Sequence, residues 1–60
     1  SEDERAYKVW KRRFDALPDT PKERDRQIRY LLYRGFSMSA VDRVIRGRVE
    51  VDESDGNYWD

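Results

Sequence analysis

Residues 29–47, RYLLYRGFSMSAVDRVIRG, join two amphipathic runs through a very short turn. Gly35 follows the first run, and glycine closes many helices because it takes the left-handed conformation without strain. Phe36 is placed to pack against the helices on both sides of the turn. Ser37 is a favoured N-cap for the run that follows. The stretch therefore predicts two helices that meet at a tight joint.

Two more helix starts precede this joint. In SEDE, Ser1 and Glu4 have the spacing of a capping box, and Pro18 is expected to end the helix that follows. In TPKE, Thr20 and Pro21 stand at the N-cap and the first helical position, with a glutamate placed to complete a second capping box. We expect three helices, at about residues 2–17, 21–34 and 38–46.

Apolar side chains recur at spacings of three and four along each predicted helix, which is the pattern of a helix with one buried face. Gly47 is the expected stop of the third helix. The sequence therefore predicts an all-α fold, a compact right-angled bundle of three short helices over residues 1–47, followed by a mostly irregular acidic tail over residues 48–60. The predicted core consists of Ala6, Val9, Trp10, Phe14, Leu17, Ile28, Leu31, Leu32, Val41, Val44 and Ile45.

The composition narrows the functional classes. Hydrophobic residues make up 37% and charged residues 43% of the 60 positions, and the chain holds neither cysteine nor histidine. Disulfides, thiolate or imidazole metal ligands, and cysteine or histidine catalysis are therefore excluded. The carboxylates lie away from the apolar surroundings that raise a pKa for acid catalysis. We expect no enzyme activity, no catalytic residue, no cofactor, no metal site and no small-molecule substrate.

Membrane association is not indicated by the sequence. No apolar run approaches the length that crosses a bilayer, and the first residues lack the pattern of a secretory signal. We therefore expect a cytoplasmic protein with no membrane partner.

The net charge of zero hides an asymmetry along the chain. All 13 basic residues lie in residues 1–48, together with 8 acidic ones, whereas residues 49–60 hold 5 acidic residues and no basic one. The body therefore carries +5 and the tail −5. The body is suited to an acidic partner, and the tail would either screen that attraction or fold back on the basic side of the body.

Arginine and tyrosine recur along one side of the second predicted helix. Arg26, Tyr30, Tyr33 and Arg34 follow one another at helical spacings, on the side away from Leu31. Such a stripe stacks on bases, holds phosphate or anchors a protein interface. Alternatively, the tyrosines pack against a neighbouring helix and the arginines are simply solvated. The sequence leaves both interpretations open.

Four other arginines need an interpretation. Arg43 and Arg46 would contact bases or phosphates if the third helix reads DNA, and otherwise form an ordinary polar face. Arg13 and Arg24 fall at the edges of apolar stripes, where we expect the stem to pack and the charged head to reach water. The candidate partner-binding residues are Arg26, Tyr30, Tyr33, Arg34, Arg43 and Arg46.

Residues 26–46, RQIRYLLYRGFSMSAVDRVIR, resemble the repeat unit of the RecX family, bacterial regulators of the RecA recombinase. Family members carry tandem three-helix repeats, each with a leucine-rich helix, an arginine-glycine-aromatic turn and a short aliphatic helix. The resemblance extends over residues 4–46 and is greatest to the last repeat, whereas the acidic tail is not part of the family's core pattern. The matching positions are Leu31, Leu32, Arg34, Gly35, Phe36, Val41 and Ile45.

The resemblance implies a non-enzymatic modulator that lies in the groove of the RecA filament on single-stranded DNA. Such a protein limits filament growth, and with it strand exchange and co-protease activity. Other repeats of the same parent chain are further expected partners. Two alternatives stay open, namely a small helix-turn-helix DNA-binding domain and a structural scaffold repeat that packs against a neighbouring repeat.

Overall fold

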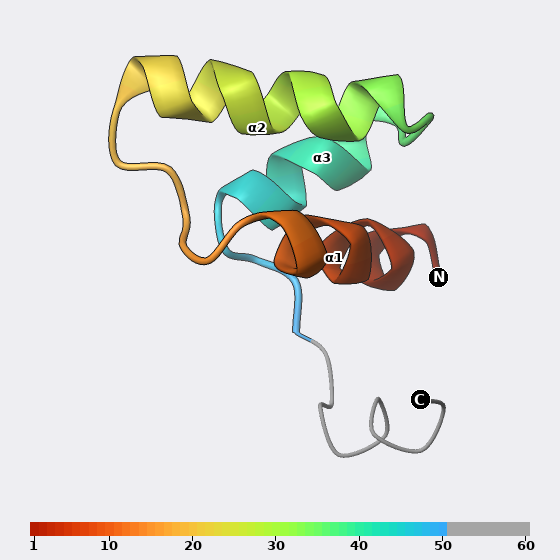
Figure 1. Ribbon diagram of the computed structural model, residues 1–60. Helices are drawn as coiled ribbons and strands as arrows, with labels where there is room; N and C mark the ends of the chain where they lie inside the picture. The colour runs from red at the N-terminus through yellow and green to blue at the C-terminus, as the bar shows by residue number, and fades with distance from the viewer. Residues whose placement is uncertain (51–60) are drawn as a thin grey trace.

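The computed structural model describes residues 1–50, which form three α-helices. The helices are α1 (Glu2–Arg13), α2 (Pro21–Tyr33) and α3 (Met38–Ile45). The short α3 lies between the other two and packs against both, while α1 and α2 contact each other less (Figure 1). The all-α prediction is confirmed. The predicted boundary at residue 47 stays a prediction, and the acidic tail lies outside the described residues from residue 51 onward.

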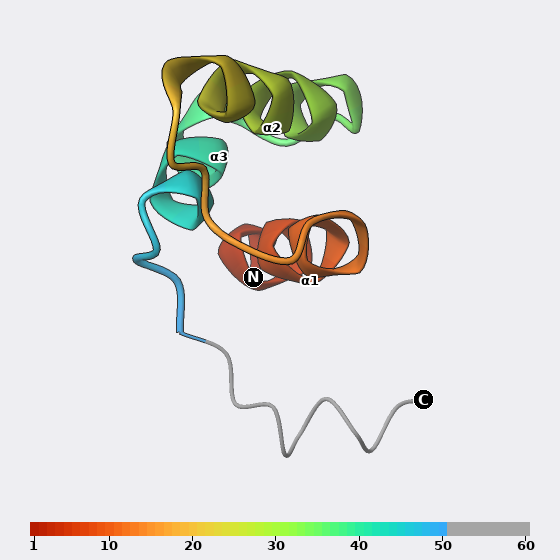
Figure 2. The same ribbon diagram turned by 60° about the vertical axis from the view of Figure 1, so that its left-hand side comes forward.

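The first helix is shorter than predicted. It ends at Arg13 rather than near residue 17, because Phe14 is extended (φ −126°, ψ 144°) and turns its ring into the core. The carbonyl of Ala16 then accepts a hydrogen bond from the Gln27 side chain (3.1 Å) rather than from a helical amide. Leu17, predicted for the core, is 45% exposed. Residues 14–20 therefore form the connector between α1 and α2 (Figure 2).

The joint after α2 has the predicted geometry. Gly35 is left-handed (φ 97°), its N–H donates to the Leu32 carbonyl (2.9 Å), and the Phe36 N–H donates to the Leu31 carbonyl (3.3 Å). These two bonds define a Schellman motif. The Ser37 hydroxyl then caps α3 by accepting from the Ala40 N–H (3.2 Å). Both helices stop one residue before their predicted ends, with the last predicted residue serving as the C-cap.

The two upstream caps differ in detail. Ser1 and Glu4 form the predicted capping box at the start of α1. At α2, the Thr20 hydroxyl accepts from the Glu23 N–H (3.1 Å), as predicted for an N-cap. The Glu23 carboxylate does not complete the second box, because it accepts hydrogen bonds from the side chains of Gln27 (3.0 Å) and Arg26 (3.2 Å).

The core is built from all three helices and the start of the connector. Val9 and Ile28 are half-buried, and Leu32, predicted for the core, is 40% exposed. The reason is that α2 turns Gln27 and Leu31 inward, one helical turn apart, which leaves Leu32 at the edge of the buried face. The buried apolar side chains are Ala6, Trp10, Phe14, Leu31, Ala40, Val41, Val44 and Ile45.

One buried amide connects α1, α2 and the connector. Gln27 is 1% exposed. Its Oε1 accepts from the Trp10 indole Nε1 (2.8 Å), and its Nε2 donates to the Ala16 carbonyl and the Glu23 carboxylate. Because a buried polar group is costly without a partner, this network fixes how the two longer helices approach each other.

Two acidic residues at the start of α1 hold α3. The Glu2 carboxylate accepts from the Ser37 backbone N–H (2.7 Å) and hydroxyl (3.0 Å), and Asp3 forms a bidentate ion pair with Arg43 (2.7 and 2.9 Å). The bond from the Ser37 N–H lowers the pKa of Glu2, and the bond from Arg43 lowers the pKa of Asp3. Both carboxylates are therefore held in their charged form.

In residues 1–50, no helix combines the length and the apolar character needed to cross a membrane.

Candidate interaction surface

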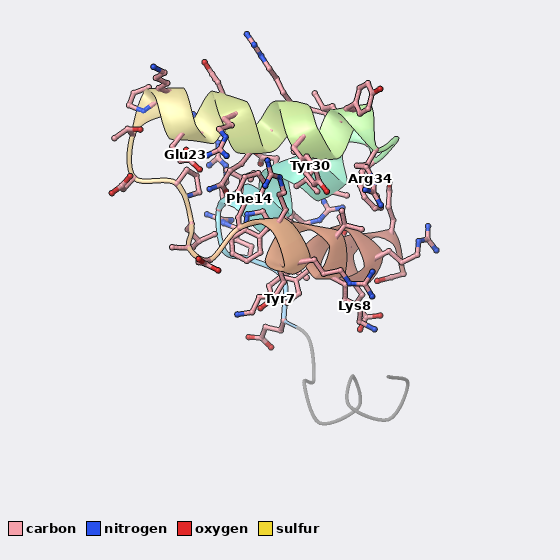
Figure 3. All side chains as sticks on the ribbon, viewed as in Figure 1. Tyr7, Lys8, Phe14, Glu23, Tyr30 and Arg34 are labelled. Carbon is pink, nitrogen blue, oxygen red and sulfur yellow. The ribbon has the colours of Figure 1, made fainter. Side chains whose placement is uncertain are left out.

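Part of the predicted arginine and tyrosine stripe gathers against the end of α1. Tyr30 is half-buried, and its ring meets the Phe14 ring edge to face, with 5.4 Å between centroids and 88° between planes. Figure 3 shows both rings between α1 and α2, with Arg34 further along α2. Tyr33 is separate from this packing, since it is 91% exposed. Tyr30 thus follows the packing interpretation, whereas Tyr33 projects into solvent.

Three guanidinium groups cover these two rings. The Arg13 guanidinium lies 5.9 Å from the Phe14 centroid and 5.8 Å from that of Tyr30, Arg26 lies 5.6 Å from Phe14, and Arg34 lies 5.9 Å from Tyr30. These distances are within the range of cation–π attraction. We call Arg13, Phe14, Arg26, Tyr30 and Arg34 the arginine–aromatic cluster.

The cluster keeps most of its positive charge free. Arg26 pairs with Glu23 at 3.2 Å, and Arg34 donates to the Tyr30 hydroxyl at 3.4 Å. Within residues 1–50, neither Arg13 nor Arg34 has a carboxylate within ion-pair distance. All three arginines are exposed. The cluster therefore offers guanidinium donors that lie over aromatic rings and face solvent.

A groove of about 600 Å³ runs along α2 and over every residue of the cluster except Arg34. Its basic lining residues are Arg13, Lys22, Arg26 and Arg29, and its one acidic lining residue is Asp25. Phe14, Tyr30 and Tyr33 add aromatic surface. An open, basic and aromatic groove can hold an anionic group beside a flat or apolar one.

The other two candidate residues lie in ion pairs on α3. Arg43 is held by Asp3 of α1, and this bond raises the pKa of the guanidinium. Arg46 pairs with Asp42 at 2.9 Å, one helical turn away. The side chains of Arg43 and Arg46 are 47% and 53% exposed. Both arginines thus have a role within the domain, while about half of each side chain faces solvent.

Sequence reasoning missed two members of the cluster. Arg13 was expected to reach water from the edge of a stripe, and Phe14 was expected only as core. The ring of Phe14 is indeed buried, yet Arg13 and Arg26 lie over it. The available indication was a phenylalanine directly after a run of basic residues at a helix end. The sequence alone did not show that this phenylalanine would leave the helix. The structure shows it, because α1 ends at Arg13 and Phe14 is extended.

No group suited to metal binding or acid catalysis emerges in the described part of the chain. Residues 1–50 hold no cluster of three or more potential metal ligands. Hydrogen bonds lower the pKa values of Glu2, Asp3 and Glu23, the reverse of the shift that an acid catalyst needs.

The fold and this surface define a three-helix domain with a basic and aromatic face. Residues 1–45 match a family model described as the third three-helix domain of RecX, and the chain therefore belongs to the RecX family of regulatory proteins. The resemblance seen in residues 4–46 is thereby confirmed.

Curated relatives agree with this assignment. The chain is 45% identical over 56 residues to a regulatory protein RecX of Ralstonia pickettii, covering 93% of this chain and 35% of the relative. It is 47% identical to the protein of that name from Ralstonia nicotianae, covering 78% and 30%, and 44% identical to that from Pseudomonas putida, covering 75% and 30%. The chain thus spans about a third of the length of these relatives. No solved structure matches it.

Proposed function

We propose that this domain takes part in regulating the RecA recombinase by binding RecA filaments on single-stranded DNA, and that it inhibits recombinase and co-protease activity there. The regulatory class follows from the family. The observation that carries the contact is the arginine–aromatic cluster, because it presents free, prepositioned guanidinium groups beside aromatic surface. A protein carboxylate or a DNA phosphate is the natural counterpart of such groups.

Four of the candidate residues form or border this surface, namely Arg26, Tyr30, Tyr33 and Arg34. Tyr30 acts mainly by holding Arg13 and Arg34 in place, since its ring lies against Phe14. Tyr33 offers an exposed ring at the rim of the groove. We propose a smaller contribution from Arg43 and Arg46, because Asp3 and Asp42 already neutralise them.

A scaffold role is the second candidate, and a specific feature favours it. Leu32, Tyr33 and Met38 are exposed large side chains near the α2–α3 joint, at 40%, 91% and 50%. A neighbouring three-helix repeat of the parent protein is a natural cover for them. The helix-turn-helix alternative is less favoured, since four of the eight residues of α3 are buried and both candidate arginines around its end are paired.

We further propose that the domain is not an enzyme and works in the cytoplasm, in keeping with a regulator of a cytoplasmic recombinase. It needs no cofactor for the contacts described, because every group involved is a side chain of the chain itself.

A titration tests the proposal. The chain is added to bare single-stranded DNA, bare duplex DNA and RecA filaments, with intrinsic tryptophan fluorescence and RecA ATPase activity as readouts at two salt concentrations. We expect the tightest binding to filaments, with a fall in ATPase activity and a weaker affinity at high salt. Tight binding to duplex DNA alone would support the helix-turn-helix alternative, and absence of filament binding would support the scaffold role.

A further inference from the structure

Three hollows follow one another around the connector between α1 and α2. The first, of about 340 Å³, is lined by Val49 together with apolar residues that include Trp10, Leu17 and Val44. The second, of about 310 Å³, lies over the connector itself. The third is the groove over the arginine–aromatic cluster. Figure 2 shows the segment after α3 on the same side of the molecule as the connector.

Neighbouring hollows share lining residues and so lie side by side, and we call the three together the track. Residues 15–17 line both the first and the second hollow. Arg13, Phe14 and Arg26 line both the second hollow and the groove. The track therefore leads from Val49, where the acidic part of the sequence begins, to Arg13 and Arg26 of the cluster.

The acidic segment and the groove carry opposite charge. Residues 49–60 hold five acidic residues and no basic one, together with Tyr58 and Trp59. The groove has four basic lining residues and one acidic one. Because the acidic segment belongs to the same chain, its effective concentration at the groove is high, of the order of millimolar for a short linker.

We propose that the acidic segment of residues 49–60 binds along this track to the arginine–aromatic cluster of its own chain, and thereby competes with the external anionic partner of that surface. The competition rests on the proposed function, whereas the binding of the segment does not. The segment acts as a built-in competitor that sets the affinity of the domain for a filament.

The length and order of the segment fit the track. The ten residues that follow Glu50 span about 33 Å when extended, and the longest dimension of the molecule is 34 Å. Val51 comes first, two positions after Val49, and the apolar side chains of Trp10, Leu17 and Val44 in the first hollow suit it. Asp15, Asp19 and Glu23 line the middle of the track, and their carboxylates repel acidic side chains there. The carboxylates expected at the cluster are therefore those from Glu53 onward.

The binding of the segment is tested by nuclear magnetic resonance of the arginine side chains. Nitrogen-15 spectra of the full chain resolve the Nε–Hε resonance of each arginine, and the native chain is compared with the variant E53Q/D55N/D60N. We expect the resonances of Arg13 and Arg26, which line the track, to shift in the variant, and to shift likewise in the native chain on going from low to high salt. Arg24 is the internal control, since it lines none of the three hollows. Unchanged resonances at the cluster would overturn the binding of the segment.

Filament binding by the same variant tests the competition separately. We expect its affinity for RecA filaments to be about threefold or more above that of the native chain, because an intramolecular competitor has been weakened. Equal affinities, with shifted guanidinium resonances, would overturn the competition alone. If neither chain binds filaments, the proposed function fails, and the resonance shifts still decide whether the segment binds its own domain.

Discussion

Gln27 joins three parts of the chain through one buried amide. Its partners are the Trp10 indole, the Ala16 carbonyl and the Glu23 carboxylate. Helical periodicity of apolar residues identifies a buried face only through apolar side chains, so a buried glutamine is missed by that rule. The same omission explains why Leu32 was predicted for the core. If Gln27 is counted as a buried residue of α2, its spacing of four from Leu31 indicates the correct buried face of the helix.

Replacing Gln27 by leucine tests the network. The change leaves the Trp10 indole N–H and the Ala16 carbonyl without their buried partner, which costs about 1–3 kcal/mol in the free energy of unfolding. Urea denaturation followed by tryptophan fluorescence measures it. Arg24→Ala, an exposed change on the same helix, is the control and should stay within about 0.5 kcal/mol of the native chain. A Gln27→Leu variant as stable as the control would contradict the assigned role.

Gly35 provides a second test at this scale. Its φ of 97° is strained for any residue with a Cβ, yet a Cβ built there meets no atom within 4 Å. Gly35→Ala should therefore cost about 1–2 kcal/mol of unfolding free energy for conformational reasons alone. Equilibrium unfolding measures the loss, and circular dichroism should show the same helix content. A neutral substitution would mean that the Schellman motif does not need a left-handed residue.

At the scale of elements, local chemistry predicts most helix boundaries. The N-caps at Ser1, Thr20 and Ser37 and the stop at Gly35 are where the sequence placed them, because each depends on neighbouring residues only. The end of α1 was wrong, because Phe14 leaves the helix for a contact with Tyr30 that lies 16 positions along the chain. The arginine–aromatic cluster was only half predictable for the same reason, since Arg13 and Phe14 join it through that packing.

The contacts between α1 and α3 make stability depend on pH. The folded state lowers the pKa values of Glu2 and Asp3 through Ser37 and Arg43. Their contribution is therefore complete above the ordinary carboxyl pKa values and is lost as the pH falls through them toward the lowered folded values, from about pH 5 downward. The raised pKa of Arg43 has no effect in this range, because the guanidinium stays charged.

Urea midpoints measured between about pH 6 and pH 3 should fall with acidity. The variant Glu2→Gln with Asp3→Asn should start lower and fall less steeply, because it has lost two of the carboxylates responsible. Glu23, whose pKa is lowered by Gln27 and Arg26, keeps part of the slope in this variant. An identical slope in both chains would show that the α1–α3 contacts do not carry the pH dependence.

At the scale of the whole molecule, the charges separate into a basic body and an acidic end, and two arginines of the body that are unpaired within the described residues are held over aromatic rings. Residues 1–48 carry +5, but Arg26, Arg43 and Arg46 are already paired with carboxylates. Arg13 and Arg34 are unpaired within residues 1–50 and are held over aromatic rings. These two arginines are therefore the ones on which binding to an acidic partner should depend most.

The affinity of RecA filaments for two matched double variants tests this claim most directly. Arg13→Gln with Arg34→Gln removes the unpaired charges of the cluster, whereas Arg5→Gln with Arg24→Gln removes the same charge from exposed positions outside the cluster. Filament binding is measured by fluorescence anisotropy on the full chain. We expect the cluster variant to bind about tenfold more weakly than the native chain, a loss of about 1.4 kcal/mol, and the control variant to lose much less. Equal losses in the two variants would show that only net charge matters and would contradict a defined binding surface at the cluster.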